Sequence, residues 1–326
     1  MPCKSMFLLA LALVAAAHAM ASASAQEWPA RPLTLVIPWA AGGGTDVMGR
    51  IMAKRMTEIV GQQVIVENIA GAGGMLGSAH VAKAAPDGYT FVFGSRSDAI
   101  NMTLYKHPIY NFQNDLAPVV LVADQPTILV ARRDLPVDGL NAFIGYVKRN
   151  ASTIKLGSAG VGATGFIDCA IFNNMIGVDI PAIPYRGSGP AMQDLIGRQF
   201  DYFCTISGSA AGPLQQNLVK GIAAFRRERL PSLPEVPTAY EQGTEFEAST
   251  WFGFFAPKAT PAPIIRKLHA ISLAAMETPS VQEQLAANGT YVVAPEKRST
   301  EYLASIIAPE IEKNGAPIRA AGLSVE

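Results

Sequence analysis

Residues 38–46 read Pro-Trp-Ala-Ala-Gly-Gly-Gly-Thr-Asp, and they join a β-branched run, Leu33 to Ile37, to an amphipathic segment, Val47 to Ile59. This order predicts a strand, a glycine loop and a helix. Because three glycines leave the turn without side chains, the first amides of the helix, with about half a positive charge, are open to an anion. The stretch fits neither a phosphate loop, which needs Lys, nor the G-x-G-x-x-G dinucleotide pattern. A plain helix cap by Thr45 or Asp46 is the alternative.

Residues 1–25 have the features of a secretory signal peptide. Lys4 gives the positive start, residues 6–17 an apolar core, and Ala23-Ser24-Ala25 a small-residue cleavage site. The mature chain is expected to begin near Gln26. No later stretch reaches the roughly 18 apolar residues of a membrane span.

The charge of the chain is balanced. Its 26 basic and 26 acidic residues become 25 and 26 once Lys4 is removed, a formal net charge of −1. This balance argues against a nucleic-acid partner. The histidines of the mature chain, His80, His107 and His269, are too scattered for a metal site, and no cofactor motif is present.

Two cysteines remain after the signal, Cys169 and Cys204, 35 residues apart. Their apolar neighbours slightly favour two buried thiols. A disulfide is the alternative, since the compartment permits one.

The rest of the chain alternates strand-like and helical segments, which predicts an α/β fold with mainly parallel sheets. A second strand-glycine-helix junction at 154–164 suggests a second lobe facing the first. Helical stretches include Thr45 to Val60 and Gly74 to Ala85, with C-terminal helices at 261–277 and 300–321. The strand-like runs are 33–37, 64–67, 89–94, 128–131, 154–157, 180–184 and 222–225.

A set of motifs in order along the mature chain resembles the Bug, or TctC, family of extracytoplasmic solute receptors of tripartite tricarboxylate transport systems. The resemblance implies a type II periplasmic-binding-protein fold, in which two α/β lobes joined by hinge crossings close on a ligand. It also implies a periplasmic monomer that hands a small carboxylate to an inner-membrane permease. The motifs are Arg31-Pro32, the loop 38–46, Val66-Glu67-Asn68, Gly71-Ala72-Gly73-Gly74, 84–90, 157–160, 184–188, 233–238 and Trp251-Phe252-Gly253.

In that family the ligand carboxylate lies between the two glycine loops, partly held through water. The carried-over positions are Ala41, Gly43, Thr45 and Asp46 in the first loop and Ser158, Ala159, Gly160 and Thr164 in the second. Hydroxyls and helix amides suit an anion, while Asp46 is expected to order water instead of touching a like charge.

Departures from the family pattern bear on the ligand. Residues 161–167 replace polar groups with apolar ones, and Thr205 stands where an acidic residue is common. Without that carboxylate an ammonium group would lack its partner, so the sequence favours a ligand other than an amino acid.

A third loop contains Ser95, Arg96 and Ser97, expected at the distal end of the ligand. Arg96 suits a second carboxylate or an aromatic ring. A dicarboxylate or an aromatic carboxylate is therefore the favoured ligand, with Phe166 and Phe225 as apolar walls. The alternative is an ion pair between Arg96 and Asp98 at the cleft rim.

Tyr185 follows the strand-like run 180–184 and is expected to present its phenol at the cleft, or else to pack in the lobe. The first lobe is expected to comprise 27–125 and 251–326, and the second 126–250. Pro126 and Ser249-Thr250 are the candidate hinges.

Two other function classes compete with a transport receptor. A ligand sensor that shows its closed form to a signalling partner would bind in the same way. An exported enzyme is the remote alternative, since Gly-x-Ser-x-Gly and evident catalytic partners are absent from the sequence.

Overall fold

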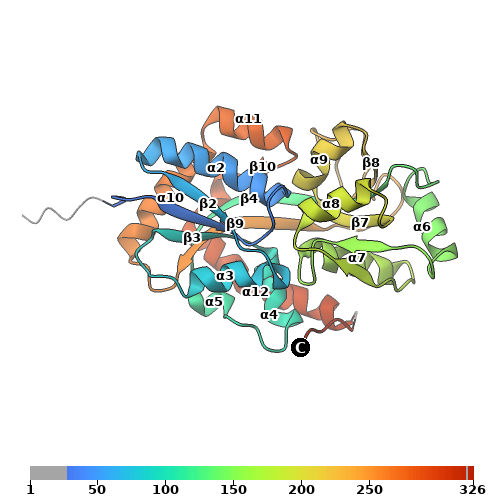
Figure 1. Cartoon of the computed structure of the whole chain (residues 1–326), viewed down its shortest axis with the longest axis horizontal. Helices are drawn as coiled ribbons and strands as arrows, with labels where there is room; N and C mark the ends of the chain where they lie inside the picture. The colour runs from blue at the N-terminus through green and yellow to red at the C-terminus, as the bar shows by residue number, and fades with distance from the viewer. Residues whose placement is uncertain (1–27, 321) are drawn as a thin grey trace, which may run out of the picture.

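The computed structural model describes residues 28–320 and 322–326, so the predicted signal peptide, 1–25, lies outside the described residues. Figure 1 shows two lobes side by side along the long axis of the molecule, with long strands running between them. Within the described part of the chain, no helix has both the length and the apolar character needed to span a membrane.

Lobe 1 contains a sheet built on β1 (Leu33–Ile37), which pairs in parallel with β2 (Val64–Asn68) and β3 (Thr90–Ser95). β9 (Ser249–Pro257) extends this sheet antiparallel to β3. The helices of this lobe are α2 (Gly44–Val60), α3 (Met75–Ala82), α4 (Arg96–Leu104), α5 (Phe112–Asp115), α10 (Ala262–Met276), α11 (Pro279–Ala287) and α12 (Thr300–Ala320).

Lobe 2 repeats the parallel arrangement around β5 (Leu156–Ser158), which lies between β6 (Ala182–Pro184) and β7 (Tyr202–Ile206). β8 (Val219–Ala224) pairs with the last residues of a long strand, β4 (Leu116–Arg132). The helices of this lobe are α6 (Leu140–Arg149), α7 (Thr164–Met175), α8 (Ser188–Ile196) and α9 (Ser207–Gln215).

The lobes share strand β4 (Leu116–Arg132). Its first part pairs antiparallel with β9 and with β10 (Tyr291–Val292), and its last part pairs with β7 and β8. β4 changes partners between Pro126, which lies opposite Ser249 of β9, and Thr127, which pairs with β7. Both crossings between the lobes therefore lie side by side in one ladder.

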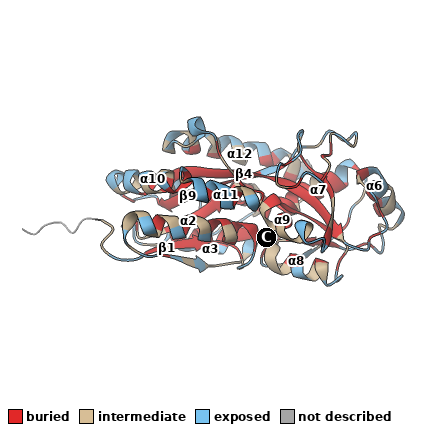
Figure 2. Cartoon of the chain, turned by 90° about the horizontal axis from the view of Figure 1, so that it is seen from above, coloured by how far each residue is buried: buried red, intermediate tan, exposed pale blue. Residues whose placement is uncertain are grey.

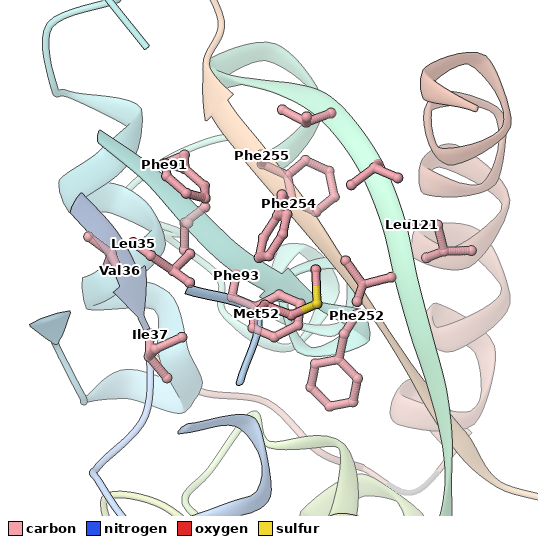
Figure 3. Close-up of a cluster of buried hydrophobic side chains, with 14 of the residues drawn as sticks. Leu35, Val36, Ile37, Met52, Phe91, Phe93, Leu121, Phe252, Phe254 and Phe255 are labelled. Carbon is pink, nitrogen blue, oxygen red and sulfur yellow. The ribbon is translucent and has the colours of Figure 1, made fainter. Parts of the chain in front are cut away.

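Each lobe has its own hydrophobic core. The core of lobe 1 lies between its sheet and helices and includes Phe93, whose ring contacts those of Phe252 and Phe254 (Figure 3). The core of lobe 2 gathers residues from 128 to 248. Figure 2 shows the buried strands of both lobes between helices that expose their outer faces. Truncating one such ring, as in Phe254→Ala, is expected to cost about 3–5 kcal/mol.

The structure confirms the α/β fold and two lobes, and it corrects two finer expectations. The outer strands are parallel, but every pairing of β4 and β9 is antiparallel, so the sheet is mixed instead of mainly parallel. Cys169 and Cys204 form a disulfide between α7 and β7, with their Cα atoms 5.5 Å apart. The expectation of two thiols was wrong, because apolar neighbours indicate burial and not redox state.

Candidate functional site

Five helices begin at one pocket between the lobes. The lining includes Thr45 from the first turn of α2 and Ser97 from that of α4 in lobe 1. From lobe 2 it includes Thr164 at the start of α7, Ser188 at the start of α8, and Ile206, the residue before α9. Because each helix start carries a partial positive charge, the pocket is suited to negative charge.

The pocket itself is uncharged. It encloses about 390 Å³ of space between atoms, part of it open to solvent. Among the described residues that line it, none has an ionisable side chain. The lining consists of six hydroxyl-bearing residues, Thr45, Ser95, Ser97, Thr164, Ser188 and Thr205, with Trp39, Ala159, Ala163, Gly165, Cys204, Ile206 and Phe252.

The glycine loop before α2 is fixed from two sides. The Gly44 amide donates to Ser209 Oγ of lobe 2 at 2.9 Å. Asp46 accepts hydrogen bonds from the Gly42 amide at 3.0 Å, from the Arg50 guanidinium and from Asn68. Burial pulls the pKa of Asp46 upward, but these hydrogen bonds outweigh it and leave that pKa below its ordinary value. Asp46 therefore braces the loop as an ionised carboxylate.

The helices α4 and α7 meet across the pocket. Ser95 caps α4, because its hydroxyl accepts from the Ser97 amide while its own amide donates to Asp98 at 2.7 Å. Ser97 Oγ in turn accepts from the Thr164 amide at 3.2 Å, which joins lobe 1 to lobe 2. Burial raises the pKa of Asp98, although hydrogen bonds from Ser78, Tyr110 and the Ser95 amide oppose it.

A wider hollow, with about 1000 Å³ of space that is partly open to solvent, lies next to the pocket and shares Trp39 and Ala159 with it. Gly160 and Tyr185 line this outer hollow, and the Tyr185 hydroxyl donates to Asp194 at 2.6 Å. Burial and the neighbouring Asp194 carboxylate raise the pKa of Tyr185 to about 12.

The structure brings together only part of the predicted set. Ser158 is buried behind the pocket, where its hydroxyl accepts from the Gly160 amide, and Ala41 is exposed in the first loop. Gly43 is the residue before α2 and faces Ser188 of lobe 2. The predicted residues that line the pocket are Thr45, Ser95, Ser97, Ala159, Thr164 and Thr205.

Arg96 lies outside the pocket lining and makes a different ion pair from the one considered. Its guanidinium pairs with Asp168 of α7 at 2.9 Å and donates to Asn314 of α12 and to the Ser249 carbonyl oxygen. The alternative with Asp98 was wrong, because Asp98 points back to the start of α4 and is occupied there. Arg96 thus joins both lobes beside the crossing strands.

Sequence reasoning missed several lining residues, among them Trp39, Ile206, Ala163 and Gly165. Ser188 and Phe252 lie in motifs quoted above but were not among the predicted contacts. Ser209 was missed altogether, although Ser207-Gly208-Ser209 after a strand carries the same signal of small residues before a helix. The segments that line the pocket have a helix start in common, whereas their side chains differ.

Comparison with known proteins shows the family of the chain. Residues 48–323 match the model described as "Tripartite tricarboxylate transporter family receptor". The structure of the periplasmic binding protein BugD is similar to 92% of this chain and all of that one, with 34% identity and a TM-score of 0.88.

Two further structures contain ligands. MatC from Rhodopseudomonas palustris with bound malate is 35% identical, covers 89% of this chain and all of its own, and has a TM-score of 0.86. Rpa4515 from R. palustris with adipate is 29% identical, covers 91% of this chain and 99% of its own, and has a TM-score of 0.86. With its fold, pocket and family match, this chain belongs to the TctC family of periplasmic solute-binding proteins.

Proposed function

We propose that this protein binds a small aliphatic dicarboxylate in the pocket between its lobes and delivers it to a membrane permease of the tripartite tricarboxylate type. The observation that supports this most is the convergence of five helix starts on a pocket lined by hydroxyls and without ionisable side chains. Amides and hydroxyls satisfy a carboxylate without a buried counter-charge.

The chemistry of the lining favours a ligand with negative charge alone. An amino acid would also bring an ammonium group, and the pocket offers no carboxylate to pair with it, since Thr205 is neutral. An unpaired buried ammonium is costly. The malate in MatC and the adipate in Rpa4515 give the size range, and both are dicarboxylates.

The structure supports an aliphatic ligand better than an aromatic one. Phe225 is buried in the core of lobe 2 against Phe172 and Phe246. Phe166 packs near Ile100 and Leu104, away from the lining. The two rings invoked as walls for an aromatic acid are therefore absent from the pocket lining described above.

The remaining roles follow from the family. We infer export by the segment 1–25, a periplasmic monomer, a binding role instead of catalysis, and lobes of 27–125 with 251–326 and of 126–250. Closure would turn about Pro126 and Ser249, which pair where the chain crosses between the lobes.

A thermal-shift screen tests the proposal. Protein purified from the periplasm is unfolded and refolded to remove carried-over ligand, then heated with mono-, di- and tricarboxylates, aromatic carboxylates and amino acids. A ligand that binds only the folded state raises the melting temperature. Selective stabilisation by malate or adipate supports the proposal, whereas stabilisation by an amino acid or by an aromatic acid alone contradicts it.

A further inference from the structure

The two lobes approach each other through glycine backbone beside the pocket. A Cβ added to Gly44, the first residue of α2, would lie 2.7 Å from the carbonyl carbon of Gly208 and 2.8 Å from the Ser209 nitrogen. A Cβ added to Gly189 of α8 would lie 2.7 Å from the Ala41 carbonyl oxygen. In both cases the obstacle is backbone of the opposite lobe, which cannot turn aside as a side chain can.

Hydrogen bonds mark the same contact. The Gly44 amide donates to Ser209 Oγ at 2.9 Å, and the Ala40 amide donates to the Arg186 carbonyl oxygen at 3.1 Å. Each bond joins one lobe to the other. The arrangement of the pocket walls described above thus depends on the lobes coming this close.

The backbone of neither helix requires glycine at these two positions. Gly44 and Gly189 both lie inside helices, and neither has a φ in the left-handed region. Alanine is the better helix former and loses less conformational entropy on folding. Glycine at these two positions is therefore explained by the backbone of the opposite lobe and not by the helix that contains it.

We propose that Gly44 and Gly189 form a closure seam that sets how closely the lobes approach and, through this, the affinity for ligand. A methyl group at either position acts as a wedge that holds the pocket walls apart while each lobe keeps its fold. The inference rests on the proposed function only because affinity is one of its readouts.

The first test compares Gly44→Ala and Gly189→Ala with Gly212→Ala. Gly212 lies inside α9, and a Cβ there would meet open space, so this variant is the matched control. Titration with malate is expected to give a Kd about 5- to 150-fold higher for the seam variants, the range for overpacking a filled contact. The control keeps the wild-type Kd, and melting without ligand is unchanged or higher in all three. A wild-type Kd in both seam variants overturns the proposal.

The second test needs no ligand. Hydrogen exchange of the segment 40–47, which holds the Ala40 and Gly44 amides, is expected to be faster in Gly189→Ala than in Gly212→Ala, although neither substitution lies in that segment. If the wild type binds no carboxylate, the proposed function fails, but this exchange still decides the role of the seam. Equal exchange in the two variants overturns it.

Discussion

Replacing Arg96 with methionine removes the cation from the buried contact between α4 and α7. Asp168 has a side chain only 1% exposed, and Arg96 has one 13% exposed. After the substitution the Asp168 carboxylate keeps the hydroxyl of Thr127 at 2.7 Å but has lost its counter-charge. Removing one partner of a buried ion pair costs about 3–5 kcal/mol. Since the guanidinium is partly solvated, we expect about 3 kcal/mol for Arg96→Met.

A double-mutant cycle isolates the pair. In Arg96→Met/Asp168→Asn the buried Asp168 carboxylate is gone as well, so most of the loss is expected to return, with a coupling of about 2 kcal/mol between the two sites. Urea unfolding followed by circular dichroism measures the free energies. Thermal melting gives a parallel estimate of about 6 °C lost in the single variant, at about 2 °C per kcal/mol for a chain of this size. Equal stability of the single and double variants would show that Asp168 does not depend on Arg96.

Three further predictions concern the pocket and its supports. Asp46→Asn is expected to lose about 1.5–3 kcal/mol of stability at neutral pH. Because the pKa of Asp46 is lowered below 3.8 on folding, the difference from wild type should vanish as pH falls through that lowered value in acid-unfolding curves; a constant difference contradicts this. Thr164→Val should raise the Kd for malate about 10- to 150-fold by calorimetry, since it removes a hydroxyl available to the carboxylate, and an unchanged Kd would exclude that contact. Cys169→Ala/Cys204→Ala should unfold about 3–4 kcal/mol more easily in urea, as expected for a bridge that closes a 35-residue separation, and equal stability would show that the bridge is absent in solution.

The pattern of small residues between strands and helices predicted two of the helix starts, and the resemblance to the TctC family supplied the expected contact residues of the pocket. Thr45, Ser97 and Thr164 line it because each begins a helix after a strand of the parallel part of the sheet, where loops gather at one edge. The order of elements along the chain was enough to predict the starts of α2 and α7. The start of α4 was expected only as a loop, and that of α9 was missed.

Contacts between residues far apart in the sequence could not be predicted from the order of elements. The strand β4 was expected only over 128–131, because its first half pairs with β9 from the other end of the chain. Arg96 is paired with Asp168, 72 residues away, and was instead assigned to the ligand. The disulfide was missed for the same reason, since the sequence does not give the distance between two cysteines.

We propose that a neutral pocket of helix starts holds a dicarboxylate in this protein. A crystal structure of the protein soaked with malate would show whether it does. We expect one carboxylate within hydrogen-bond distance of the hydroxyls of Thr45, Ser97 or Thr164, and no arginine or lysine in contact with the ligand. Malate bound to Arg96 or to Arg186 of the outer hollow instead would contradict it.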